Sequence, residues 1–332
     1  MPTPAGPLSL VDIAPEDNQR YGLNDIGNGN LFADWYKEKA RFVPERKQWY
    51  IYDGKVWKPD TGGLKAMQLC KKLADALYIY ALSIKDEARK GAYMKHVGKW
   101  QSRHNRETIL KDAASVYPVP IAEFGTDPFL FNCLNGTLDL RTREFRPHSP
   151  GDLLSLISGV KYDPAARCER WEKFVNEIMQ GDRERALFFQ KALGYALTGD
   201  TEFECFFILY GATSRNGKGT SMETFRRVLG DYGRAAKPET IAMKPTANEA
   251  MPSEDIARLA GARFVNISEP DKKLVLSAAL VKTLTGNDTI TARFLHENGF
   301  EFQPQFKLFI NTNHLPQVTD VTLFSSGRVK LI

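Results

Sequence analysis

One segment restricts the fold of this chain more than any other: a strongly apolar run that leads straight into a glycine-rich turn. Phe203–Tyr210 (FECFFILY) has the length and composition of a strand buried on both faces of a parallel sheet. Residues 211–217 form the glycine-rich stretch, and Lys218–Leu229 then has a helical pattern. A buried strand, a glycine-rich loop and a helix in this order predict an α/β domain with a phosphate-binding loop.

The chemistry of such a loop comes from its backbone. Glycines let consecutive N–H groups turn inward around a phosphate, and the start of the following helix adds the positive end of its dipole. The ammonium of Lys218 would reach the β- and γ-phosphates as a point charge. We therefore expect the loop and the first turn of its helix to bind phosphate through Ala212, Ser214, Asn216, Gly217, Lys218, Gly219 and Thr220.

Two features of the loop depart from the common pattern. The spacing from Gly211 to Gly217-Lys218 is one residue longer than G-x-x-x-x-G-K, so the usual spacing begins at Ala212. Gly219 stands where a Ser or Thr usually ligates Mg²⁺. Thr220 is the nearest hydroxyl, and we expect it to be the metal ligand.

Two further strands are predicted, Arg263–Ser268 (RFVNIS) and Phe306–Ile310 (FKLFI), with the helical segment Leu274–Leu284 between them. An open α/β sheet presents its ligands at the carboxyl ends of its strands. Glu269 follows the first of these strands, and we expect it to orient Mg²⁺ or to serve as general base. Ser268 fills the place of a possible first acid.

The third predicted strand also ends in polar residues. Asn313 follows it, and an amide at this point can hydrogen-bond both the attacking water and the γ-phosphate. Asn311 and Thr312 are alternative candidates for the same role.

The first half of the chain is predicted to be a smaller α+β domain. We interpret residues 1–25 as a loose leader, residues 26–165 as the α+β domain and residues 166–332 as the α/β domain. Gln48–Trp57 predicts a hairpin with an Asp53-Gly54 turn, residues 62–116 are mostly helical in pattern, and Phe131–Phe145 returns to strands. Four tryptophans are expected in the core: Trp35, Trp49, Trp57 and Trp100.

Composition excludes several classes of protein. The longest uncharged stretches fall well short of a membrane-spanning helix, and the first residues lack the basic and apolar regions of a secretory signal. The net charge of +5 permits a polyanionic partner without requiring one. The four cysteines are scattered without a CxxC pair, so we expect reduced thiols in a cytoplasm rather than a zinc site or disulfides.

Five segments in sequence order resemble the motifs of superfamily III helicases. They are ILYGATSRNGKGT, LAGARFVNISEP, LVKTLTGNDTITARFL, FKLFINTNHLP and FSSGRVKLI. The chain looks most like the helicase part of phage and plasmid primase-helicases, relatives of the poxvirus primase-helicase. The resemblance implies an AAA+-like P-loop helicase core with a parallel sheet in residues 166–332.

The resemblance also implies roles for single residues. Lys218 and its loop would bind ATP, Glu269 would be the acid of the second motif, and Asn313 would sense the γ-phosphate. Arg328 stands where the family has an arginine finger, which completes the site of a neighbouring subunit in a ring, expected to be a hexamer. The implied activity is an ATP-dependent DNA helicase or translocase that acts in phage, prophage or plasmid replication in a bacterial cytoplasm.

A DNA contact is expected in the third of these motifs. Thr289–Leu295 and Gly299–Phe302 predict a hairpin with a polar tip. Lys282, Arg293 and His296 would contact the phosphates of single-stranded or fork DNA. The alternative is an ordinary surface hairpin.

Family chains continue beyond the arginine-finger strand, so we expect the helicase domain to be cut short at Ile332. No two aspartates stand two apart as Asp-x-Asp, which argues against primer synthesis by this chain. A separate primase is a candidate partner, and whether a primase is fused or separate stays open. Two other functions stay open. One is a nucleotide kinase, and the other is an initiator-type assembly protein that binds DNA and nucleotide without unwinding.

Overall fold

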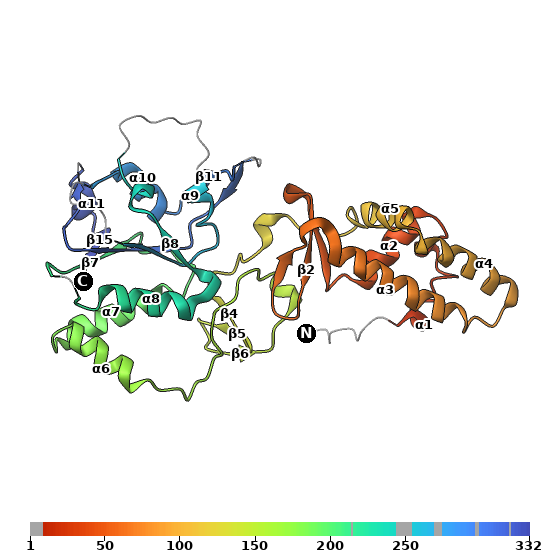
Figure 1. Cartoon of the computed structure of the whole chain (residues 1–332), viewed down its shortest axis with the longest axis horizontal. Coiled ribbons are helices and arrows are strands. Elements are labelled where there is room, and N and C mark those ends of the chain that lie inside the picture. The colour runs from red at the N-terminus through yellow and green to blue at the C-terminus, as the bar shows by residue number, and fades with distance from the viewer. Residues whose placement is uncertain (1–8, 214, 244–253, 269–273, 296–298, 319) are drawn as a thin grey trace. The chain divides into compact units, whose positions relative to one another are not determined.

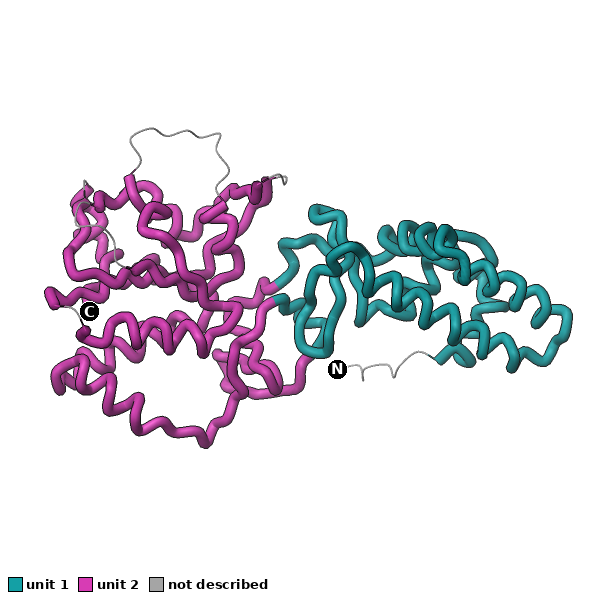
Figure 2. Tube along the Cα trace, in the orientation of Figure 1, with its two compact units in different colours: residues 1–124, 149–155 teal, residues 125–148, 156–332 magenta. Residues whose placement is uncertain are grey.

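The computed structural model describes residues 9–213, 215–243, 254–268, 274–295, 299–318 and 320–332, which form two compact units. The first unit holds the chain up to Phe124 and residues 149–155, and the second holds residues 125–148 and 156–332 (Figure 2). In the described part of the chain, no helix is both long and apolar enough to cross a membrane.

The first unit is an antiparallel sheet with a group of helices, as predicted for an α+β domain (Figure 1). Its strands are β1 (Ala40–Val43), β2 (Gln48–Tyr52) and β3 (Trp57–Pro59). Its α-helices are α1 (Leu10–Ile13), α2 (Asp25–Trp35), α3 (Leu64–Ala81), α4 (Glu87–Gly98) and α5 (Arg103–Ala113). Its 3₁₀ helices are η1 (Gln19–Tyr21), η2 (Pro44–Arg46), η3 (Thr61–Gly63), η4 (Lys99–Gln101), η5 (Ile121–Glu123) and η6 (Pro150–Asp152).

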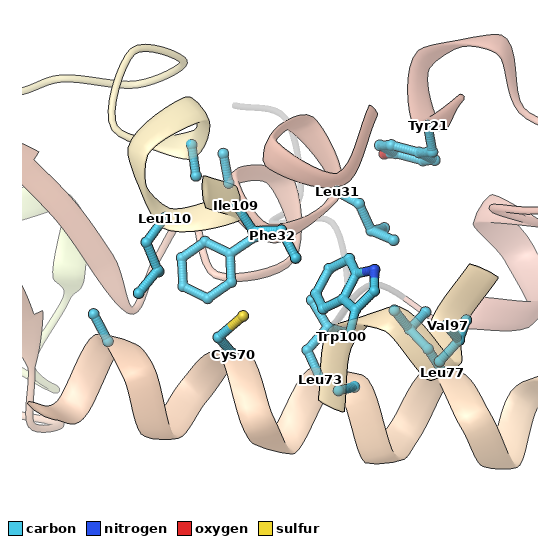
Figure 3. Close-up of a cluster of buried hydrophobic side chains, with 14 of the residues drawn as sticks. Tyr21, Leu31, Phe32, Cys70, Leu73, Leu77, Val97, Trp100, Ile109 and Leu110 are labelled. Carbon is cyan, nitrogen blue, oxygen red and sulfur yellow. The ribbon is translucent and has the colours of Figure 1, made fainter. Parts of the chain in front are cut away.

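The hairpin predicted in this unit is confirmed. Tyr52 pairs with Trp57 across the turn, and Gly54 in the turn has a φ of 103°, which favours glycine. The tryptophans lie in the core as expected: Trp49, Trp57 and Trp100 are buried, and Trp35 is partly buried. Figure 3 shows the side chains of this core converging between α2, α3 and α5.

The described part of the predicted leader is packed rather than loose. Tyr21 is buried in the core of the first unit, and its hydroxyl donates to Asp34 at 3.1 Å. The neighbouring Arg20 guanidinium donates to the same carboxylate at 2.5 Å. The ring of Tyr21 and the ion pair of Arg20 therefore fix this segment to the core of the first unit, although its composition alone indicated a loose loop.

The second unit is built on a five-stranded parallel sheet with the order β15-β7-β13-β9-β8, so the predicted α/β class is confirmed (Figure 1). These strands are β7 (Phe206–Tyr210), β8 (Gly233–Ala236), β9 (Phe264–Ser268), β13 (Lys307–Thr312) and β15 (Val329–Leu331). The shorter strands are β4 (Leu130–Cys133), β5 (Gly136–Asp139), β6 (Phe145–Arg146), β10 (Val275–Leu276), β11 (Ile290–Ala292), β12 (Phe300–Phe302) and β14 (Gln317–Val318). The helices are α6 (Glu169–Ile178), α7 (Arg183–Tyr195), α8 (Lys218–Leu229), η7 (Gly230–Tyr232), η8 (Pro238–Thr240), α9 (Glu254–Ala257), α10 (Ala278–Thr285) and α11 (Thr322–Ser325).

Both faces of the parallel sheet are covered, which explains why its strands read as continuous apolar runs. On the face toward α7 and α8, the rings of Phe207 and Phe309 stack with their centroids 4.6 Å apart, and Phe264 lies 4.9 Å from Phe309. On the other face, Ile208, Ile267 and Ile310 and their neighbours pack with α10.

The units divide the chain at a different place from the boundary expected near residue 165. Residues 125–148 fold with the second unit, where Phe131 stacks on Tyr232 at 5.0 Å and the backbone N–H of Asn132 donates to the Tyr232 hydroxyl. Residues 149–155 return to the first unit, where the carbonyl of Leu154 accepts from the N–H of Trp57 at 2.9 Å. The sequence of residues 125–148 predicts strands by itself. The core against which these strands pack is determined by contacts with residues far away in the sequence.

Two buried cations tie the amino end of the parallel sheet to the segments around it. The guanidinium of Arg263 donates to the carbonyls of Leu197 and Leu130 at 2.7 and 2.8 Å. The Lys307 ammonium donates to the carbonyls of Thr198 and Asp200, and burial lowers the pKa of this lysine well below its ordinary value. Arg263 directly precedes β9 and Lys307 is the first residue of β13, so both cations lie at the amino end of the sheet and away from its carboxyl end.

Candidate functional site

The glycine-rich loop joins the carboxyl end of β7 to the start of α8, as the sequence predicts. Lys218 is the first residue of α8, and Gly217 precedes it with a φ of 87°. The strand β13 lies directly beside β7, so the residues that follow β13 come next to the loop. Asn313 thereby meets Lys218 although 95 residues separate them in the chain.

Three neutral oxygens hold the Lys218 ammonium. Its Nζ donates to Oδ1 of Asn313 at 2.9 Å, to Oδ1 of Asn216 at 3.0 Å and to the carbonyl of Gly211 at 3.2 Å. Burial lowers the pKa of Lys218 from its ordinary value. No ion pair between this lysine and a carboxylate is present in the described part of the chain. A cation surrounded by neutral dipoles is suited to bind an anion.

A cavity of about 300 Å³ opens beside this lysine at the carboxyl end of the sheet. It is lined by the loop and the first turn of α8, by the end of β9 and by the end of β13. The lining residues are Arg215, Asn216, Gly217, Lys218, Gly219, Thr220, Ser268, Asn311, Thr312 and Asn313.

The structure brings together most of the residues predicted for phosphate binding. Six of them line this cavity: Asn216, Gly217, Lys218, Gly219, Thr220 and Asn313. Ala212 belongs to the loop but is not one of the lining residues. Ser214 and Glu269 lie outside the described residues.

Of the three candidates at the end of β13, Asn313 is the one that contacts Lys218. The hydroxyl of Thr312 donates to the carbonyl of His314 at 2.5 Å and accepts from the N–H of the same residue. The side chain of Asn311 donates instead to Asn266 of β9 at 2.8 Å. Asn266 was missed by the sequence analysis, although its spacing of two from Ser268 places both side chains on one face of the strand.

The side chains around the cavity are compatible with a hydrated Mg²⁺ bound together with a nucleotide. Mg²⁺ keeps several waters and takes few protein ligands when phosphates supply the rest. Hydroxyls are available from Thr220 and Ser268, and Oδ1 of Asn311 is buried without a hydrogen-bond partner in the part of the chain that the structure describes. In the described ranges, no group of three or more His, Cys, Asp or Glu side chains forms a metal site.

Two glycines of the loop offer a matched pair for testing the backbone. A Cβ on Gly217 would lie 2.4 Å from Cγ2 of Ile178, and its φ is unfavourable for other residues, whereas a Cβ on Gly219 meets nothing within 4 Å. We expect Gly217→Ala to lower the free energy of unfolding by about 1–3 kcal/mol. Gly219→Ala, in a helical position, should leave it unchanged or raise it by up to about 1 kcal/mol. Urea denaturation of both variants measures this, and equal effects would contradict the packing of α6 on the loop.

Arg328 does not lie at this cavity. Its guanidinium pairs with the carboxylate of Glu204 and donates to the hydroxyl of Thr285 at 3.1 Å. The carbonyl of Arg328 accepts from the N–H of Phe206, the first residue of β7. The loop follows the last residue of β7, so the length of this strand, roughly 15 Å, separates Arg328 from the phosphate loop of its own chain.

Of the residues predicted to bind DNA, the structure describes Lys282 and Arg293. Lys282 lies on α10, where its ammonium pairs with Asp320 at 2.7 Å and donates to the hydroxyl of Thr322. The predicted hairpin is confirmed, since β11 and β12 pair antiparallel. Arg293 follows β11, and His296 lies outside the described residues.

Comparisons with known proteins agree with the resemblance inferred from the motifs. Residues 29–180 match the family described as D5 N terminal like. The chain is 28% identical over 229 residues to "Putative helicase L207/L206" of Acanthamoeba polyphaga mimivirus, which covers 68% of this chain and 24% of that protein. It is 29% identical over 164 residues to "Putative helicase 022R" of Frog virus 3 (isolate Goorha), which covers 48% of this chain and 16% of that protein.

Solved structures with a similar fold include two apo structures of the NrS-1 C terminal region. One has a TM-score of 0.52 at 12% identity and covers 93% of this chain and 61% of that chain. The A form apo structure has a TM-score of 0.51 at 12% identity, and the match covers 88% of this chain and 57% of that chain. These matches describe the fold only. The chain spans about a quarter or less of the viral relatives.

Proposed function

The motifs, the D5 N terminal like region and the viral relatives indicate that the chain is a relative of the primase-helicases, and on this premise we propose that it is an ATP-dependent DNA helicase or translocase of a replication system. The observation that carries this proposal is the Lys218 ammonium, which lines the cavity and is held by oxygens of Gly211, Asn216 and Asn313.

The described side chains suit the steps of phosphoryl transfer to water. The Lys218 ammonium would exchange its neutral oxygen partners for β- and γ-phosphate oxygens, which are stronger acceptors because they are charged. The amide of Asn313, once released, would orient the attacking water and sense the γ-phosphate. Mg²⁺ bound with the nucleotide would neutralise charge on the phosphate oxygens. Thr220 would hold it, and Glu269 is the proposed general base.

We also propose assembly into a ring of six subunits, and the placement of Arg328 supports this proposal. This arginine lies at the opposite end of β7 from its own loop. If it stabilises the charge of the transition state, it must do so at the site of a neighbouring copy. The same arrangement would couple hydrolysis in one subunit to movement of the next.

DNA binding is proposed for the β11–β12 hairpin, with Arg293, which follows β11, and His296, which comes between the two strands in the sequence, contacting the phosphates of single-stranded or fork DNA. The salt bridge to Asp320 gives Lys282 a structural role besides any contact with DNA. A separate primase would supply primers in such a system. Replication of phage, prophage or plasmid DNA in a bacterial cytoplasm remains the proposed setting.

The experiment that tests this function is ATP hydrolysis measured with and without single-stranded DNA, alongside the oligomeric state from light scattering. We expect hydrolysis that DNA stimulates in the assembled protein. Changing Lys282, Arg293 and His296 together to alanine should weaken DNA binding and flatten its salt dependence, while nucleotide affinity stays unchanged. Nucleotide-dependent assembly without hydrolysis would favour the initiator-type protein. Hydrolysis that needs a nucleoside monophosphate and ignores DNA would favour a kinase.

A further inference from the structure

A layer of polar side chains lies on one face of the parallel sheet, at its carboxyl end. Asn266 and Ser268 of β9 share this face because they are two residues apart, and Asn311 of β13 stands directly opposite Ser268 in the strand pairing. Toward the amino end, the same face carries the aromatic core of Phe207, Phe264 and Phe309. Polar residues at the edge of such a core need a reason beyond packing.

The three polar side chains form a directed chain of hydrogen bonds. Nδ2 of Asn311 donates to Oδ1 of Asn266 at 2.8 Å, and Nδ2 of Asn266 donates to Oγ of Ser268 at 3.0 Å. Since Oγ of Ser268 accepts in this chain, its own proton is left to be donated elsewhere. Ser268 lines the cavity, so the proton is available to an acceptor there.

The other end of this chain is an unsatisfied acceptor. Asn311 is 5% exposed, and among the residues that the structure describes its Oδ1 has no hydrogen-bond partner. Buried carbonyl oxygens in proteins are nearly always paired, with protein or with water. Asn311 lines the same cavity as Thr220 and Lys218, so a ligand bound there can supply a donor.

We infer that Asn311 is a positioning residue whose Oδ1 accepts a hydrogen bond from a water in the hydration shell of the divalent cation that enters with the nucleotide. The inference rests on the proposed function and names residues that act at its site. Water on a divalent cation is a strong donor, and the buried carbonyl oxygen is the matching acceptor. Asn311 also orients Ser268, which stands in place of an acid, to donate to a phosphate oxygen. The hydrogen-bonded chain of Asn311, Asn266 and Ser268, called the relay below, is uncharged and takes the place of a carboxylate at position 268.

The test compares two substitutions of Asn311 with opposite effects. Asn311→Leu keeps the size of the side chain and removes the acceptor, whereas Asn311→Asp supplies a charged acceptor at the same place. Both substitutions remove the Nδ2 donor to Asn266, so the difference between them isolates the acceptor. The matched control is Asn287→Asp, which adds the same charge at an exposed asparagine that does not line the cavity. The concentration of Mg²⁺ that half-saturates binding of a fluorescent, non-hydrolysable ATP analogue is measured for each protein.

We expect Asn311→Leu to raise this Mg²⁺ concentration by about tenfold or more, as is typical when an outer-shell partner of a metal is removed. Asn311→Asp should lower it. Asn311→Asp should also melt at a lower temperature than the unchanged protein in EDTA, because its carboxylate is buried unpaired, and Mg²⁺ with the analogue should remove the difference. The control should behave as the unchanged protein does.

An unchanged Mg²⁺ requirement in both Asn311 variants, in a protein that binds and hydrolyses ATP, would overturn the relay while leaving the proposed function intact. If Asn311→Leu fails to fold, Asn311→Asp and Ser268→Ala carry the same test. Failure of the unchanged protein to bind the analogue at any Mg²⁺ concentration would instead overturn the proposed function.

Discussion

Replacing Lys218 with alanine should lower the turnover of ATP by at least about 100-fold, because the site loses the cation that compensates charge on the transferred phosphate. The three oxygens that now hold the ammonium belong to Gly211, Asn216 and Asn313, and none of them can take over this charge. Steady-state hydrolysis measures the turnover, and binding of labelled ATP measures the affinity for the nucleotide. We expect both turnover and affinity to fall.

Lys161→Ala is the matched control, since this lysine is exposed and does not line the cavity. Lys218→Ala should keep its far-ultraviolet circular dichroism and its melting temperature to within a few degrees, because the ammonium is held by three hydrogen bonds to uncharged oxygens and by no ion pair in the described part of the chain. Turnover equal to that of the control would remove the loop from the mechanism.

Replacing Arg328 with alanine should lower turnover by roughly 100-fold or more in the assembled protein, since an arginine that stabilises the transition state in trans contributes on that scale. The physical reason is its position at the far end of β7 from its own loop. Turnover is measured as a function of protein concentration. Below the concentration at which copies associate, the variant and the unchanged protein should be equally slow.

The salt bridge of Arg328 with Glu204 requires its own control, because Arg328→Ala also breaks this contact. Glu204→Gln breaks the ion pair and keeps the arginine, so it should lose similar stability and retain turnover. Mixing Arg328→Ala with Lys218→Ala subunits should restore part of the activity, because some interfaces then combine an intact loop with an intact arginine. Slow turnover in Glu204→Gln and no recovery on mixing would make Arg328 a structural residue only.

Much of the second unit could be predicted because its signals are local. The run FFILY, the glycines after it and the helical pattern that begins at Lys218 specify β7, the loop and α8 within a few residues of each other. The hairpins at Gln48–Trp57 and at residues 290–302 were predicted for the same reason, since alternation and turn residues are contained in the segment itself.

The relay of Asn311, Asn266 and Ser268 could not be predicted in this way. Its members lie on two strands that are adjacent only because β13 pairs with β9 on one side and with β7 on the other. The alternation of residues along each strand predicts which side chains share a face of the sheet. It does not predict which other strand lies beside it. For the same reason the sequence left Asn311, Thr312 and Asn313 as alternatives, and the contact with Lys218 distinguishes them.

From sequence alone came the kinds of element, the prediction that the loop binds phosphate and the resemblance to the helicase family, since these depend on spacing and composition within short segments. Tertiary structure alone decided the order of the strands, the packing of residues 125–148 with the second unit and the partners of Arg328 and Lys282. Distant segments come together because burying both faces of the sheet removes apolar side chains from water. The sequence pattern of a single segment does not specify which distant segment packs against it.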